Sequence, residues 1–378
     1  MSSSTTHREP ELDGFAFPPP LPSEAMRAPV PDDVPRRKAR FSPAEAIETA
    51  IAVLGATAFA LTLRMLLDWG GVMGTVLWAY VAFLGLVYLL ARDRESPEVA
   101  ADRVITTLIW SAGAVVIGVL TWMVGFLALK GSHALRPGFF TNDLSTTGPL
   151  SPGGGALHAI IGSFEQVGLA TVVVVPVAVM TAVYLHEIRG RMAGLIRFIV
   201  DAMSGLPSVV AGLLVFTVWI IGLKRGFSGA AGSTALAILM LPTVTRTAEE
   251  ILRTVPDQLR EASLALGAPQ WRTVLRIVLP TARSGLVTAA ILGVARAVGE
   301  TAPVLLTAFG SDSTNTSPFN GPQANLPLFV WKLIRLPNNA QKDRAWTGAF
   351  VLVVLVLALF TLARWIGNRG QKKLGRSR

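Results

Sequence analysis

The sequence PDQLREASLALGAPQWRTVLRIVLP, residues 256–280, decides how this chain is organised. It is polar and broken by glycine, and it lies between two long apolar runs. Pro256 suits the first turn of a helix, and Asp257 places favourable charge near the N-terminus of that helix. Gly267 can adopt the left-handed conformation that ends a helix, and Pro269 can start the next one. The pattern predicts two short helices joined by a tight turn.

Each predicted helix carries an apolar stripe at helical spacing. The stripes are Leu259, Ala262 and Leu266, with Ser263 beside them, in the first helix, and Trp271, Leu275 and Val278 in the second. The second helix is predicted to end before Pro280. Three interpretations compete: a plain connector, a DNA-binding helix-turn-helix, and a docking element for a cytoplasmic motor. The DNA interpretation is excluded because both flanks enter the membrane within a few residues and leave no freedom to reach a groove.

The composition is that of a membrane protein. Hydrophobic residues make up 51% of the 378 residues and charged residues only 15%, below the quarter or so that is usual in soluble domains. There is no cysteine, so disulfides and thiolate metal sites are excluded. The four histidines show no metal-ligand spacing, and no metal site is predicted. The fold class is therefore all-α, a polytopic membrane protein.

Apolar runs of about 20 residues, long enough to cross a bilayer, recur along the chain. The predicted spans are 46–67, 72–91, 104–129, 161–185, 198–222, 231–250, 283–309 and 346–366. The span at 198–222 is interrupted by Gly205, Pro207 and Gly212. With the N-terminus inside, 22 Lys and Arg lie in inner segments and 8 in outer ones. This excess predicts that both termini and the 256–280 loop are cytoplasmic.

The spacing of the inner loop resembles that of a known family. Glu261, Ala262 and Ser263, then Gly267, then Ile277-x-Leu279-Pro280, are similar to the EAA loop of bacterial ABC importer permeases. Ser263 departs from the pattern, which has a second alanine there. The resemblance implies a six-helix permease core of the type I importer kind. It also implies that these seven residues couple the membrane helices to a separate ATPase.

A second set of segments narrows the resemblance. ARAVGETAPVLLTA at 295–308, GLPSVVAG at 205–212 and YLHEIRG at 184–190 resemble the permease of the bacterial phosphate ABC importer, in particular its PstA-type subunit. The expected organisation has five parts. They are a disordered Pro-rich cytoplasmic tail at 1–45, two additional transmembrane helices at 46–91, the permease core at 103–367, its EAA loop at 256–280, and a basic cytoplasmic tail at 368–378.

Arg296, Glu300 and Thr301 are the candidate substrate-pathway residues. Arg296 and Glu300 are four residues apart within an apolar run, so they share a helix face if the helix is continuous. Each ionised group there costs about 2.5–3.5 kcal/mol, which is tolerable if the two pair or face an aqueous path. An arginine suits an oxyanion because its fork donates two parallel hydrogen bonds. A purely structural ion pair is the alternative.

The chain lacks a G-x-x-x-x-G-K-[ST] sequence, so no P-loop is available to bind ATP. No catalytic residues or cofactors are predicted on this chain, and the protein is not expected to be an enzyme. The resemblance implies partners: an ATP-binding subunit dimer that carries ATP and Mg, a PstC-like sister permease, and an extracytoplasmic phosphate-binding protein. The bacterial inner membrane is the expected location. The alternatives are a permease for another oxyanion, or a stand-alone secondary transporter or channel.

Overall fold

The computed structural model of the protein describes residues 43–67, 71–94, 96–148, 151 and 153–374. Within these residues the chain is almost entirely helical, and an isolated bridge between Phe309 and Gln323 is the one β-type pairing. The predicted all-α class is confirmed. The predicted tail at 1–45 lies outside the described residues up to position 42. The predicted basic tail at 368–378 is helical as far as Leu374, and the rest of it lies outside the described residues.

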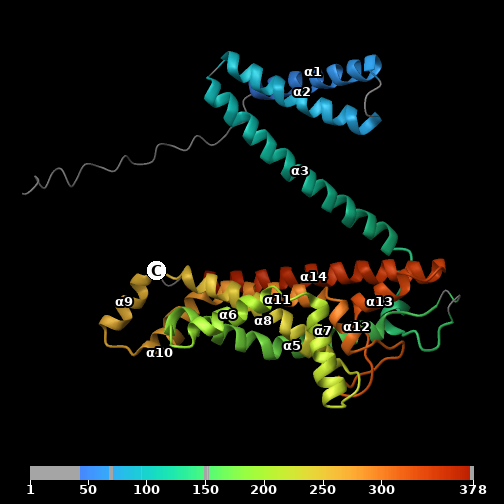
Figure 1. Ribbon diagram of the computed structural model, residues 1–378, viewed down its shortest axis with the longest axis vertical. Coiled ribbons are helices and arrows are strands. Elements are labelled where there is room, and N and C mark those ends of the chain that lie inside the picture. The colour runs from blue at the N-terminus through green and yellow to red at the C-terminus, as the bar shows by residue number, and fades with distance from the viewer. Residues whose placement is uncertain (1–42, 68–70, 95, 149–150, 152, 375–378) are drawn as a thin grey trace, which may run out of the picture. The chain divides into compact units, whose positions relative to one another are not determined.

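The helices follow one another along the chain, with longer connections between α4 and α5 and between α12 and α13 (Figure 1). They are α1 (Pro43–Leu67), α2 (Gly71–Arg94), α3 (Pro97–Gly131), α4 (Pro137–Thr141), α5 (Leu157–Val183), α6 (Ala193–Ser204), α7 (Ser208–Val215), α8 (Gly229–Arg253), α9 (Asp257–Ala265), α10 (Gln270–Thr273), α11 (Leu279–Val298), α12 (Ala302–Thr307), α13 (Leu326–Ile334) and α14 (Asn339–Leu374). Wider π-helical turns extend three of them: η2 (Tyr184–Ile188), η3 (Phe216–Gly222) and η4 (Val274–Val278).

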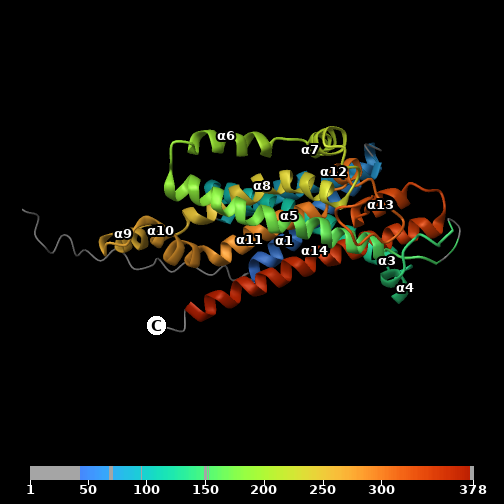
Figure 2. The same ribbon diagram turned by 90° about the horizontal axis from the view of Figure 1, so that it is seen from below.

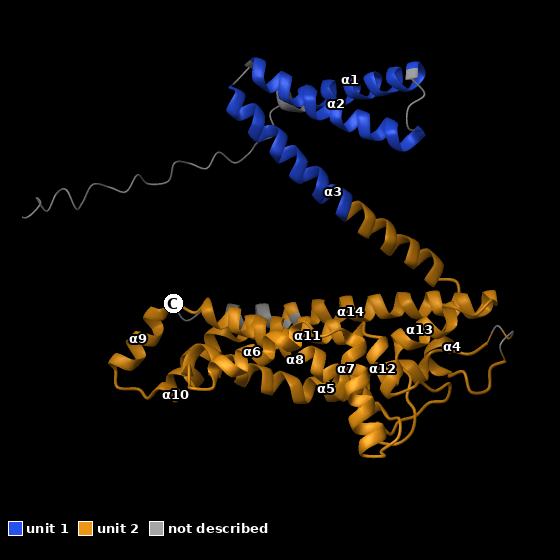
Figure 3. Ribbon diagram, in the orientation of Figure 1, with its two compact units in different colours: residues 1–116 blue, residues 117–378 orange. Residues whose placement is uncertain are grey.

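The chain forms two compact units, residues 1–116 and 117–378 (Figure 3). In the first unit α1 packs against α2, and the small side chains of Ala52, Ala56 and Ala60 are buried. The hydroxyls of Tyr80 and Ser111, 2.5 Å apart, join α2 to α3. Small residues at four-residue spacing let two helices approach closely, which is a common packing mode in membranes.

The second unit is built around α8. Helices α5, α8, α11 and α14 run side by side, with α9 and α10 at one end and α4 and α13 at the other (Figures 1 and 2). Leu236, Met240 and Val244 of α8 are completely buried, in a core shared with α5, α11 and α12. Polar residues on α8 are therefore covered by neighbouring helices, so this helix does not need an apolar surface toward lipid.

Among the described residues, six helices are long and apolar enough to cross a membrane, and the bent pair α6–α7 would make a seventh. They account for every predicted span except 231–250, which corresponds to α8. This segment is helical as expected, but it carries threonines and charged residues, of which Thr245 and Glu249 are buried. The predicted interruption of 198–222 is also found, because α6 and α7 meet at an angle of 107°.

The predicted continuous span at 283–309 is wrong. The helix begins earlier, at Gln270, and α11 ends at Val298. The chain then turns at Gly299–Thr301 and continues as the short helix α12, which packs against α7 and α8. Pro303 sits in the first turn of α12, where a proline starts a helix favourably and does not extend the preceding one. An apolar run alone does not reveal such a break.

The connections at 142–156 and 308–325, which are predicted to lie outside the membrane, fold back onto the helices. The carboxylate of Asp143 accepts hydrogen bonds from Ser145 and from the backbone and hydroxyl of Thr314, at 2.7–3.1 Å. The hydrogen bond from the Ser145 hydroxyl, together with those from Thr314, holds the pKa of Asp143 well below its ordinary range. Ser163 of α5 accepts from the backbone N–H of Leu326 at 2.8 Å. These bonds fix the 310–325 return against the start of α5.

The close contact between α5 and this return gives a test of the fold. A Cβ on Gly162 would lie 2.0 Å from the carbonyl oxygen of Ala324, whereas a Cβ on Gly168 would meet nothing within 4 Å. We expect Gly162→Ala to lower stability by about 1–3 kcal/mol through overpacking. We expect Gly168→Ala, on the same helix, to be neutral or slightly stabilising. Thermal unfolding of the purified protein in detergent measures both, and equal effects would contradict the described packing.

Candidate functional site

The turn of the inner loop is closed by a glycine in the left-handed region. Gly267 has φ +77° and follows α9 directly. Its N–H donates to the carbonyl of Leu264 at 2.9 Å, and the N–H of Ala268 donates to the carbonyl of Ser263 at 3.2 Å. This pair of bonds is a Schellman motif, which satisfies carbonyls that the helix end leaves open. The predicted helix–turn–helix is therefore present, with the turn at the predicted glycine.

A buried hydrogen bond joins the two helices of the loop. The hydroxyls of Ser263 and Thr273 lie 2.8 Å apart, and both residues are buried. Ser263 is the position at which the sequence departs from the E-A-A pattern. The structure gives this departure a local purpose, because an alanine there would leave the hydroxyl of Thr273 without this partner.

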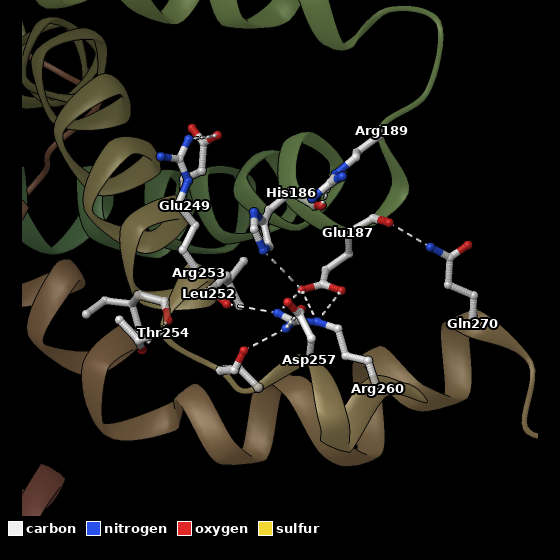
Figure 4. A network of polar contacts seen from close by, with 12 residues as sticks. His186, Glu187, Arg189, Glu249, Leu252, Arg253, Thr254, Asp257, Arg260 and Gln270 are labelled. Atoms are coloured by element: carbon white, nitrogen blue, oxygen red, sulfur yellow. Dashed lines mark hydrogen bonds and ion pairs between the residues drawn. The ribbon is translucent and has the colours of Figure 1, made fainter. Parts of the chain in front are cut away.

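Arg260 anchors the loop to the rest of the unit (Figure 4). Its Nη2 donates to Glu187 Oε1 at 2.7 Å, and its Nε contacts both carboxylate oxygens at 3.1–3.2 Å. The remaining N–H groups donate to the carbonyls of Val255 and Leu252 and to Asp257 Oδ1, at 2.6–2.9 Å. The pKa of Arg260 is raised, chiefly because its guanidinium donates to the Glu187 carboxylate.

The second helix of the loop reaches the same point. Gln270 Nε2 donates to the backbone carbonyl of Glu187 at 2.6 Å (Figure 4). Glu187 belongs to η2, the π-helical end of α5. Both short helices therefore converge on one residue of α5, and a cavity of about 230 Å³ lies between them and η2, lined in part by His186 and Arg189.

The opposite side of the loop is open. The structure places the predicted coupling residues as follows: Glu261, Ala262, Gly267 and Pro280 are exposed, Ser263 is buried, and Ile277 and Leu279 are half-buried. Among the apolar side chains, Leu266 is 89% exposed and Trp271 is 59% exposed. Val278, expected on a stripe with Trp271 and Leu275, is fully buried. A rigid loop thus presents large apolar side chains outward.

The predicted end of the second helix before Pro280 is wrong. The chain is helical from Gln270 to Val298, and the wider turn η4 comes directly before α11. A proline ring clashes with the carbonyl four residues earlier in a regular α-helix. A π-helical turn rearranges the hydrogen bonds at this point, so the helix continues through the proline. The inner loop is consequently one end of a membrane helix.

The pathway candidates lie at the other end of α11. Arg296 is 46% exposed, donates to the hydroxyl of Thr243 on α8 at 3.1 Å, and has its Nε 3.8 Å from Glu300 Oε1. Glu300 and Thr301 lie beyond the helix end, and Thr301 is the N-cap residue of α12. Arg296 is 17 residues along α11 from Leu279, about 25 Å at 1.5 Å per residue. Arg296 and Glu300 therefore lie close together as predicted, although they are not on one continuous helix.

Comparison with known proteins decides the family. The family of binding-protein-dependent transport system inner membrane components matches residues 174–374. The phosphate transport system permease protein PstA 1 of Mycobacterium tuberculosis (strain CDC 1551 / Oshkosh) is 42% identical over 267 residues, 70% of this chain and 88% of that protein. The chain belongs to the PstA-type permeases. PstA of Pasteurella multocida is 38% identical over 248 residues, 65% of this chain and 86% of that protein. A chain of the inward-facing MetNI methionine ABC transporter aligns at a TM-score of 0.45 and 20% identity, over 57% of this chain and 94% of that chain.

Three polar residues of the site in this PstA-type permease, Glu187, Arg260 and Thr243, could not be identified from the sequence. Glu187 and Arg260 are 73 residues apart, and Thr243 lies 53 residues before Arg296. No local spacing links such partners. Two features of the sequence could have pointed to the first pair. Arg260 directly precedes the E-A-S segment, and Glu187 is the one acidic residue in the otherwise basic segment 187–197. Among the described residues, no group of three His, Asp or Glu is arranged to hold a metal ion.

The buried hydroxyl pair of the PstA-type loop can be tested by a double-mutant cycle. We expect Ser263→Ala and Thr273→Val each to lower the opening free energy of α9 by about 1 kcal/mol. The coupling energy between the two substitutions should be about 0.5–1.5 kcal/mol. Hydrogen exchange of the α9 amides measures the opening free energy. Thr247→Val is the control, because its hydroxyl donates within its own helix, to the carbonyl of Thr243. Strict additivity of the two substitutions would contradict the pairing.

Proposed function

We propose that this chain is the permease subunit of an ATP-driven importer of inorganic phosphate. The observation that carries the proposal is its 42% identity to a protein named as a phosphate transport system permease, over 88% of that protein's length. The exposed Arg296, near the end of α11 and close to Glu300, is chemically suited to an oxyanion. A binding-protein-dependent family favours an importer of several subunits over a stand-alone transporter or channel.

The proposal includes three partners. The apolar face of the inner loop, with Leu266 and Trp271 exposed, suits a groove in a separate ATP-binding subunit, which would carry ATP and Mg. A PstC-like sister permease would complete the membrane pathway. An extracytoplasmic phosphate-binding protein would deliver the substrate to the outer loops. The excess of Lys and Arg in the inner segments supports cytoplasmic termini and a cytoplasmic loop.

The mechanism follows from the continuity of the helix that begins at Gln270. Closure of the ATPase would displace the loop at 256–280, and this displacement would pass along one helix to Arg296. Because Arg296 also donates to Thr243, movement of α11 relative to α8 would change how the guanidinium is presented. Phosphate would be held by the guanidinium through charge-assisted hydrogen bonds and released when α11 is re-aimed.

The coupling role of the loop is tested at its glycine. Gly267 has a left-handed φ of +77° and open space around it, so strain and not a clash opposes a side chain there. We expect Gly267→Val to cost about 1–3 kcal/mol of local strain and to distort the turn. ATP hydrolysis by the assembled complex should then lose its coupling to phosphate uptake, while membrane insertion stays normal. Uptake in proteoliposomes with parallel ATPase assays measures this, and unchanged transport would refute docking through this turn.

The pathway role is tested at Arg296. We expect Arg296→Ala to abolish phosphate uptake while the complex still assembles, because the positive charge facing the pathway is lost. Arg296→Lys should restore only part of the uptake, since lysine keeps the charge but not the planar fork. Arg283→Ala, an exposed arginine near the start of the same helix, is the matched control and should transport normally. Normal uptake by Arg296→Ala would exclude a role in the pathway.

A further inference from the structure

The 256–280 loop is joined to the membrane helices at three places. At two of these the connection is the backbone. Helix α8 leads into the loop, and α10, η4 and α11 lead out of it. The third connection, to α5, is made by side chains. Because α5 packs closely along α8, a link to η2 at the end of α5 ties the loop to a helix that ends 68 residues earlier in the chain, at Ile188.

The third connection is a buried ion pair with a fixed geometry. The side chains of Arg260 and Glu187 are 14% and 7% exposed, so water competes little for their hydrogen bonds. Arg260 approaches the Glu187 carboxylate with two nitrogens, while its other N–H groups meet the end of α8 and Asp257. Two parallel bonds resist both sliding and rotation, which a single contact does not.

Two π-helical turns lie next to this contact. Glu187 lies in the π-helical turn η2, and η4 lies in the helix that leaves the loop. π-helical turns interrupt the regular ladder of hydrogen bonds and are frequent at functional sites. The two short helices, which Gln270 also fastens to the backbone of Glu187, are thus held as one body against the end of α5.

We propose that Arg260 is a positioning residue that carries displacement of the inner loop to α5 through Glu187. Closure of the motor then re-aims α5 together with α8 and α11, and not only the two helices that the chain connects to the loop. This inference rests on the proposed coupling role of the 256–280 loop. It differs from a purely structural role because it assigns the movement of one helix to one ion pair.

The test measures helix movement in the assembled transporter. The chain contains no cysteine, so engineered cysteines in it accept spin labels selectively once the partner subunits are free of reactive cysteine. One label pair joins exposed Met180 of α5 to exposed Leu357 of α14, and a second joins exposed Leu292 of α11 to Leu357. Distances are recorded by pulsed electron spin resonance with and without a trapped ATP state.

Both distances should change on trapping in the unmodified complex. In Arg260→Ala we expect the α5 distance to lose most of its change while the α11 distance keeps it, and uptake to fall by about 10-fold, within the range typical of coupled sites. Glu187→Gln, which keeps the shape of the side chain and removes its charge, is the second variant and should act in the same direction. Glu250→Gln breaks an exposed ion pair with Arg253 and is the matched control, with both changes retained.

An unchanged α5 movement in both variants would overturn the inference. That outcome would leave the proposed coupling intact, because the α11 label pair reports it separately. If instead neither pair moves in the unmodified complex when the ATPase is bound and trapped, the coupling role of the loop itself is wrong. The two failures are therefore distinguishable within one set of samples.

Discussion

A membrane interior offers no water to a broken helix, and the second unit of this protein nonetheless interrupts its helices repeatedly. At the break around α12, groups of the protein itself satisfy the freed backbone. The carbonyl of Ala308 accepts from the backbone of Gln323 at 3.1 Å, and the carbonyl of Thr307 accepts from that of Ser228 at 3.3 Å. The 310–325 segment therefore caps α12 through Gln323, and it also accepts from the backbone of Ala230 at the start of α8, through the carbonyl of Pro318 at 2.6 Å.

The same requirement explains which parts of the fold could be predicted from the sequence. Length and apolarity identify α1, α2, α3, α5 and α14, because those helices expose large apolar faces. They do not identify the break after Val298, since residues on both sides of it are equally apolar and only the partners of the freed backbone differ. They also indicate α8, which the sequence predicts as the span at 231–250. Within α8 the polar side chains of Thr245 and Glu249 are buried, and such burial cannot be predicted from hydropathy.

Some features of the candidate site could be predicted from the sequence, and others could not. The turn at Gly267 was predictable, because a left-handed conformation has few alternatives to glycine and its flanking proline restarts a helix. The neighbourhood of Arg296 and Glu300 was predictable in part, because two charges in an apolar run need a partner or a path. The contact between Arg260 and Glu187 was not, since it joins α9 to η2 across 73 residues, and only the folded chain brings them together.

Arg260 and Arg296 differ in how many of their N–H groups remain available to a ligand. Arg260 is 14% exposed and its N–H groups are occupied by protein oxygens, so it has little capacity for a further ligand. Arg296 is 46% exposed, with a single hydrogen bond to Thr243 and a carboxylate 3.8 Å from its Nε, so donors remain for an anion. A saturated guanidinium transmits force because its geometry is fixed. An unsaturated one has donors left to exchange partners. In the proposed mechanism, movement of the 256–280 loop, which contains Arg260, passes along the helix that begins at Gln270 and changes the partners of Arg296.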